Sequence, residues 1–99
     1  MKLPYYAVIF TSVKTKDTEG YDEMAMKMVA LAQQQEGFLG VESARNELGI
    51  TVSYWKDLKA IENWKQNLDH LDAQAKGKSK WYKNYIVRIA LVEREYSFI

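Results

Sequence analysis

Four side chains that could do chemistry fall within residues 53–74, which read SYWKDLKAIENWKQNLDHLDAQ. His70 is the only histidine of the chain. Apart from perturbed carboxylates, it is the only side chain suited to general base catalysis at neutral pH. Trp64 could stack on a flat aromatic ligand. Tyr54 and Trp55 are neighbours in an extended segment, so they point to opposite faces of a strand and only one can share a ligand with Trp64.

Each of these residues also has a purely structural interpretation. His70 would then lie at the surface, in the first turn of the last helix, bonded to a backbone group. Trp64 continues a helical apolar stripe with Leu58 and Ile61, so it could simply belong to the core. A tryptophan that lines a binding site is also a packed tryptophan, and the two interpretations of Trp64 overlap.

Arg88 interrupts a segment that is otherwise apolar. A charge in such a strand needs a partner, and Glu42 on another predicted strand is a candidate. The sequence leaves open whether Arg88 forms this structural ion pair, is simply exposed at the edge of the sheet, or stabilises negative charge on a ligand.

Composition excludes several classes of function. The chain has 99 residues, a net charge of +1 and no cysteine, which predicts one domain over residues 1–99 with no field that would attract nucleic acid. Without cysteine there is no disulfide, thiolate catalysis or cysteine-bound metal, and a reducing cytoplasm suits the chain. One histidine and scattered carboxylates make a poor metal site, and no Gly-rich phosphate loop is present.

The N-terminal run MKLPYYAVIF is too short and lacks the cleavage site of a signal peptide, so it predicts a first strand. No segment approaches the roughly 20 apolar residues of a membrane helix. Asp17 or Thr18 is expected to cap the first helix, and Asp57 the second. The first helix should end near Glu36, with Gly37 in the left-handed region. Strands are expected at residues 5–13, 38–45, 50–55 and 82–98, and helices at about 18–36 and 57–80, the second restarting at Asn67 or Asp69.

This order of elements predicts an α+β, ferredoxin-like βαββαβ fold with a four-stranded antiparallel sheet. Helices would cover one face of that sheet, yet residues 5–13 and 85–92 are apolar on both sides. The same face of a second copy is the simplest cover, which predicts a homodimer.

Three segments of the chain resemble the antibiotic biosynthesis monooxygenase family, and in particular a bacterial branch whose members are mostly uncharacterised. They are QEGFLGVESAR, TVSYWKDLKAIENWKQNLDH and WYKNYIVRIALVEREY. The middle segment is the most specific, and the resemblance extends over about residues 7–98. It implies a dimeric α/β barrel with a pocket between the sheet and the helices of each subunit.

The resemblance also implies site residues. Oxygenases of this kind use an Asn and a Trp on the second helix, a polar aromatic residue after it, and an Arg on the last strand. Asn63, Trp64, His70 and Arg88 fall at or near those positions. On this interpretation the catalytic residues are His70 and Arg88, and the substrate-binding residues are Trp64, Tyr54, Asn63 and Trp55.

The expected activity is that of a cofactor-independent monooxygenase, without metal or flavin, on a small aromatic or quinol-type molecule. The first alternative is a non-catalytic dimer that binds a small ligand or has a stress role. The second is a haem-binding or haem-degrading protein. It is disfavoured because Gln74 stands where those relatives have their haem-ligating histidine, and no asparagine occurs among residues 8–10.

Overall fold

The computed structural model describes the backbone of residues 1–75 and 81–98 and the side chains of residues 1–69 and 81–98. Its elements follow the predicted order of strand, helix, strand, strand, helix, strand. They are β1 (Tyr5–Lys14), α1 (Tyr21–Gln33), β2 (Phe38–Arg45), β3 (Gly49–Trp55), α2 (Leu58–Ala75) and β4 (Tyr82–Val92).

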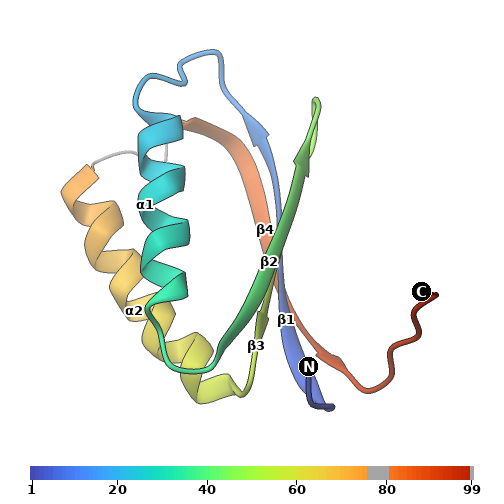
Figure 1. The fold of residues 1–99 in the computed structure, drawn as a ribbon. Coiled ribbons are helices and arrows are strands. Elements are labelled where there is room, and N and C mark those ends of the chain that lie inside the picture. Colours follow the sequence, from blue (N-terminus) through green and yellow to red (C-terminus); the bar gives the residue numbers. More distant parts are fainter. Residues whose placement is uncertain (76–80, 99) are drawn as a thin grey trace.

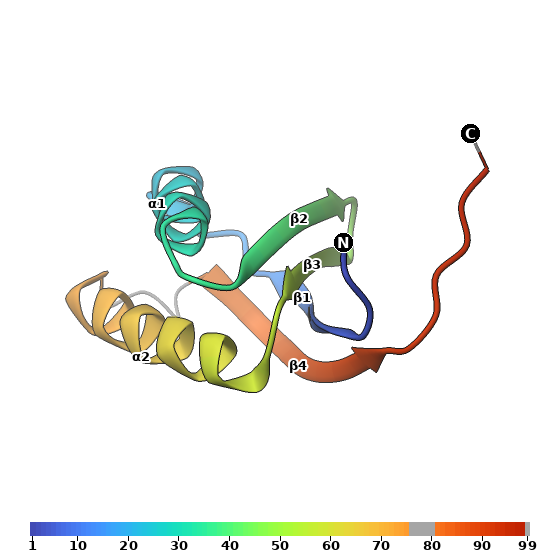
Figure 2. The same cartoon turned by 60° about the horizontal axis from the view of Figure 1, so that its bottom comes forward.

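The four strands form one antiparallel sheet in the order β2-β3-β1-β4. Both helices lie against the same face of this sheet (Figure 1). Figure 2, turned by 60°, shows the same two layers, and in both views the C-terminal residues after β4 extend away from the helices. The predicted ferredoxin-like α+β fold is therefore confirmed.

Strand register assigns each residue to one face of the sheet. Val8 lies opposite Ser53 and Ile89, and all three point to the side of the helices, which we call the helix face. Ile9 lies opposite Val52 and Arg88 and points to the other side, the open face. The two central strands thus contribute to both sides of the sheet, as the apolar pattern of residues 5–13 predicted.

The core lies between the helix face and the inner stripes of the two helices. Its buried members come from β1, α1, β3 and α2, and partly buried aromatic rings surround them. The buried residues are Val8, Ala32, Trp55, Ala60 and Ile61, and the residues packed against them are Tyr6, Phe38 and Trp64. On α2, Ala60 and Ile61 are buried and Trp64 and Leu68 are half-buried, whereas Leu58 is 52% exposed and lies outside the predicted stripe.

The helix ends confirm two of the predicted signals and correct one. The side-chain carboxylate of Asp57 accepts the N–H of Ala60 at 2.8 Å, so it caps α2 as expected. Gly37 has φ 89°, in the left-handed region. The predicted cap of α1 by Asp17 or Thr18 is wrong, because α1 begins after Gly20, which has φ 79° and no side-chain cap.

Two boundaries near the C-terminus also differ from the prediction. Helix α2 is continuous, and the Asn67 side chain donates to the backbone carbonyl of Asn63 at 3.0 Å, within the helix, instead of starting a new one. Strand β4 ends at Val92, opposite Tyr5, because β1 supplies no partner beyond that residue. The expected extension of the strand to residue 98 is wrong. Neither of the described helices is long and apolar enough to cross a membrane.

Candidate functional site

Two indole rings meet on the helix face of the sheet. Trp55, the last residue of β3, is fully buried, and its ring centroid lies 4.8 Å from that of Trp64 on α2, with an angle of 30° between the planes. The ring of Phe38 packs edge-on against Trp55 at 5.4 Å and 77°. These three residues come from β2, β3 and α2, so an aromatic wall forms where the sheet meets the second helix.

The two indole N–H groups of this wall have different environments. The N–H of Trp55 donates to the Ser53 hydroxyl at 2.9 Å, and Ser53 is itself buried. The N–H of Trp64 is buried and finds no hydrogen-bond partner within the described residues. A buried donor without an acceptor costs about 1–3 kcal/mol. An oxygen atom of a bound molecule could satisfy this donor.

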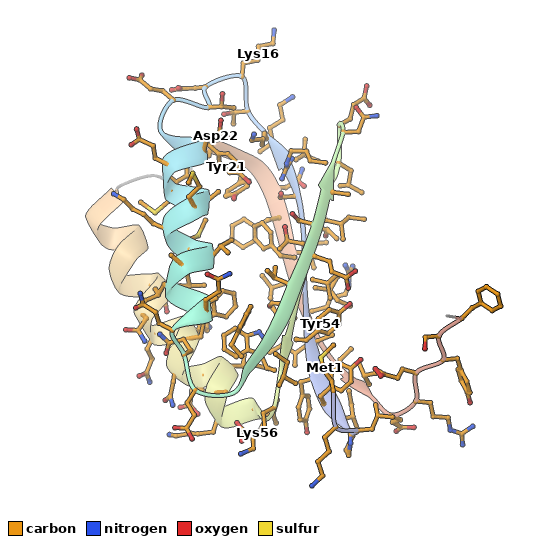
Figure 3. All side chains as sticks on the ribbon, in the orientation of Figure 1. Met1, Lys16, Tyr21, Asp22, Tyr54 and Lys56 are labelled. Atoms are coloured by element: carbon orange, nitrogen blue, oxygen red, sulfur yellow. The ribbon has the colours of Figure 1, made fainter. Side chains whose placement is uncertain are left out.

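Tyr54 lies on the opposite side of the sheet from Trp64, on the open face (Figure 3). Its hydroxyl donates to the Glu42 carboxylate at 2.7 Å, and its ring packs edge-on against that of Tyr5 with centroids 5.7 Å apart. The hydroxyl of Tyr5 donates in turn to Glu95 at 2.5 Å. The open face therefore carries two tyrosine–glutamate pairs side by side.

These pairs shift the titration of both tyrosines. The hydrogen bond to Glu95, followed by burial, raises the pKa of Tyr5 to about 12. The hydrogen bond to Glu42 raises the pKa of Tyr54 in the same way. In each case the carboxylate favours the protonated phenol, because ionisation would lose the bond and place two negative charges together.

Arg88 is also on the open face and does not pair with Glu42. Glu42, Val52, Ile9 and Arg88 occupy one row across all four strands, with Glu42 and Arg88 on the two edge strands. Three strand spacings separate their backbones by about 14 Å. The predicted ion pair is wrong, and Glu42 instead accepts the hydrogen bond of Tyr54.

The remaining predicted site residues lie on α2. Asn63 is exposed, although it is adjacent to Trp64 in the sequence. His70 belongs to α2, but its side chain lies outside the described ones. The fold brings Trp55 and Trp64 together and places Tyr54 and Arg88 across the sheet from them.

A second aromatic cluster, which sequence reasoning missed, lies at the far end of the helix face. Tyr21, at the start of α1, contacts the rings of Trp81 and Tyr82 at 5.9 Å each, and Phe10 contacts Tyr85 at 5.3 Å. The amino group of Lys14 lies 3.8 Å above the ring of Tyr21. The only sequence signal for this cluster was the presence of tyrosines beside lysines, such as Tyr82 beside Lys83. That signal does not show that Tyr21 contacts Trp81, which is sixty positions away. Within the described residues, no group of three or more acidic or histidine side chains could hold a metal ion.

Comparison with known proteins gives consistent matches over most of the chain. The family model described as antibiotic biosynthesis monooxygenase matches residues 4–76. A Bacillus subtilis (strain 168) protein named Uncharacterized protein YqjZ is 53% identical over 97 residues, which cover 96% of this chain and 85% of the relative.

Solved structures share the fold at low identity. PA3566 from Pseudomonas aeruginosa superimposes with a TM-score of 0.70 at 20% identity, covering 94% of this chain and 96% of that one. SnoaB from Streptomyces nogalater, described as a cofactor-independent oxygenase, gives a TM-score of 0.68 at 10% identity over 95% and 96% of the two chains. At these identities the likeness concerns the fold alone.

Proposed function

Because the chain belongs to the antibiotic biosynthesis monooxygenase family, we propose that it is a cofactor-independent monooxygenase acting on a small aromatic or quinol-type substrate. The observation that carries the proposal is the buried indole N–H of Trp64, which has no acceptor in the described residues and lies beside the ring of Trp55. An aromatic molecule that carries an oxygen substituent matches both features. The SnoaB structure supports the cofactor-free part of the proposal, since a protein with this fold is described as such an oxygenase.

In this proposal the indole wall orients the substrate. Trp64 donates its N–H to a phenolic or quinol oxygen, and that bond strengthens as negative charge develops there. His70 is the proposed base that removes the phenolic proton, because it lies on α2 and because imidazole is the side chain best suited to general base catalysis at neutral pH. Asn63, at the surface of α2 beside Trp64, is the proposed contact at the rim of the site.

The reaction balances without any added reductant. The phenolate supplies the electrons that reduce oxygen, and a carbon–oxygen bond forms at the ring carbon that loses its hydrogen. One oxygen atom stays in the product as a quinone carbonyl. The other leaves as water with the two hydrogens that the substrate gives up, one from the hydroxyl and one from the ring carbon. His70 carries the first of these protons.

The functional unit in this proposal is a cytoplasmic homodimer, formed by the open faces of two sheets. Ile50 and Ile86 are 42% and 51% exposed on that face, and soluble proteins rarely leave such a surface uncovered. A second copy would cover it symmetrically. Tyr54 and Arg88 would then line the interior between the two sheets instead of sharing the site of Trp55 and Trp64.

Oxygen uptake with a panel of quinols and naphthols tests the activity. We expect Trp64→Phe, which keeps a ring and removes the N–H, to lower kcat at least tenfold while the protein stays folded. Trp81→Phe is the matched control, since its N–H is already bound to the Glu19 carbonyl at 2.8 Å. His70→Ala should abolish turnover. Saturable binding of the panel without any oxygen uptake would replace this proposal with the non-catalytic ligand-binding dimer.

The assembly is tested separately by sedimentation. Ile50→Glu and Ile86→Glu introduce charges on the open face and should convert a dimer into a monomer. Met26→Glu is the control, because Met26 is 73% exposed on the outer side of α1. A wild-type protein that sediments as a monomer at micromolar concentration would refute the dimer.

A further inference from the structure

At the far end of the helix face, two cations flank one aromatic ring. The amino group of Lys14 lies 3.8 Å from the centroid of the Tyr21 ring, and the guanidinium carbon of Arg45 lies 6.0 Å from the same centroid. Lys14 ends β1, Arg45 ends β2, and Tyr21 begins α1. Three elements thus bring two positive charges to the edge of the second aromatic cluster.

The position of Arg45 depends on two small residues. Its guanidinium donates to both the hydroxyl and the backbone carbonyl of Ser12, which is 1% exposed. To reach β1 it passes directly over Gly49 on β3, where a Cβ atom would collide with it. Gly49 therefore leaves room for the Arg45 side chain to cross the sheet on the helix face. The hydrogen bonds to Ser12 keep the guanidinium there, and the side chain does not extend fully into solvent.

Among the side chains that the structure describes, no carboxylate pairs with either cation. Arg45 uses two of its donors on Ser12, and Lys14 contacts only the ring of Tyr21 within the described part of the chain. Asp22 and Glu23 occupy the first turn of α1, yet neither forms an ion pair with them. The planar fork of an arginine suits a carboxylate, and the amino group of Lys14 can add a second charge.

Aromatic surface continues onto β4, where Tyr85 lies opposite Ser12, the residue that Arg45 contacts. Phe10 and Tyr85 pack at 5.3 Å with an angle of 34°, and Tyr82 contacts Phe10 edge-on at 5.5 Å. Tyr85 remains 39% exposed, so its ring can be covered further. The cations suit the carboxylate of an aromatic acid, and the exposed aromatic rings suit the ring of such an acid.

We propose that this cluster is a second binding site, which recognises an aromatic carboxylate through Arg45 and Lys14. The ring of the ligand packs on Tyr85 and Phe10, and the carboxylate meets the guanidinium of Arg45. The site is distinct from the Trp55–Trp64 wall. Gly49 lies opposite both Arg45 and Ser12, whereas Trp55 lies opposite Tyr6, six residues along β1. It does not require that the protein catalyse any reaction.

The test compares two probes of the same shape, 2-naphthoate and the neutral 2-naphthylmethanol. Each is titrated into the ¹⁵N-labelled protein, and amide and indole N–H shifts give both the affinity and the place of binding. We expect 2-naphthoate to bind at least tenfold more tightly, with shifts centred on Lys14, Tyr21 and Arg45 and not on the indole N–H of Trp64.

Substitutions then separate charge recognition from a structural role. Arg45→Gln should reduce the affinity for 2-naphthoate to that for 2-naphthylmethanol, and Arg45→Lys should retain part of the difference. Lys14→Gln should weaken the binding of 2-naphthoate several-fold. If Arg45→Gln does not fold, the affinity of Lys14→Gln is the test of charge recognition. Lys59→Gln, an exposed lysine at the start of α2, is the control.

Three results would overturn the proposal. They are equal affinity for the charged and neutral probes, shifts confined to Trp64 and its surroundings, and no detectable binding of 2-naphthoate at millimolar concentration. Oxygen uptake is not a readout of this experiment, so a failure here leaves the proposed activity to its own test.

Discussion

Gly37 lies so close to Ala60 that a Cβ atom built on Gly37 would be 2.7 Å from the Cβ atom of Ala60. The carbonyl of Gly37 also accepts the N–H of Lys56 at 2.8 Å. The turn between α1 and β2 is thereby fastened to the turn between β3 and α2. Trp55 directly precedes Lys56, so this contact fixes one end of the aromatic wall.

Gly37→Ala should lower the free energy of unfolding by about 2–3 kcal/mol. A side chain there would combine the cost of the left-handed backbone, φ 89°, with the clash against Ala60. Urea denaturation at neutral pH measures the change. Gly40→Ala is the control, since its added Cβ would have only an ordinary contact, 3.9 Å from the Tyr54 ring, and should change stability by less than about 1 kcal/mol.

Asp57→Ala should cost about 1 kcal/mol, because the N–H of Ala60 at the start of α2 would lose its acceptor. Asp57→Asn keeps a side-chain oxygen at this position and should recover most of the loss. Both are measured by the shift in urea midpoint at constant m-value. Equal destabilisation by the two substitutions would show that the charge of Asp57, not its capping bond, matters.

Stability should fall between pH 10 and 12 through Tyr5. Its pKa is raised from 10.0 to about 12, so the folded chain holds a proton that the unfolded chain has released. Its contribution to stability is therefore present below pH 10 and is lost as pH rises through about 12. Absorbance at 295 nm should show a tyrosine that titrates near pH 12 and is lost in Tyr5→Phe.

The variant Glu95→Gln tests whether the carboxylate of Glu95 is the cause of the raised pKa of Tyr5. It keeps an acceptor for the hydroxyl of Tyr5 and removes the carboxylate, so the pKa of Tyr5 should move down toward its ordinary value. An unchanged titration curve in Glu95→Gln would mean that the hydrogen bond to Glu95 does not exist in solution.

A haemin titration should give no saturable change in its absorption band. The family resemblance implies that haem-degrading relatives carry an asparagine at a position matching residues 8–10, where this chain has Val8, Ile9 and Phe10, and Val8 is 5% exposed within the core. Among the described side chains of the proposed site, the N–H of Trp64 is a hydrogen-bond donor and cannot ligate iron. A one-per-subunit shift that is lost in His70→Ala would instead identify a haem protein.

The sequence predicted correctly those helix ends that depend only on neighbouring residues. Gly37 and Asp57 were recognised because a left-handed turn and a helix cap each favour few residue types. The start of α1 was predicted at the wrong residue, because Asp17 and Thr18 are good caps in isolation while the turn up to Gly20 takes precedence. The end of β4 depends on where its partner β1 begins, which the sequence of β4 does not contain.

The site was predictable only in part for a similar reason. Alternation showed that Tyr54 and Trp55 lie on opposite faces, but only the packing of Trp55 on Trp64 decides which of them faces the helices. Arg88 and Glu42 do share the open face, as the strand register shows. They do not pair, because the strand order places them at opposite edges of the sheet.

The connectivity of β1 has a consequence for synthesis of the chain. This strand lies in the interior of the sheet, yet its pairing with β4 joins Tyr5 to Val92, from the first strand to the last. A nascent chain therefore carries β1, with one edge unpaired and apolar residues on both faces, until β4 has left the ribosome. Such long-range pairing slows folding. Of the four strands, the one that is synthesised first is therefore the last to gain both of its partners. Until then, chaperones that bind apolar segments would keep it from aggregating.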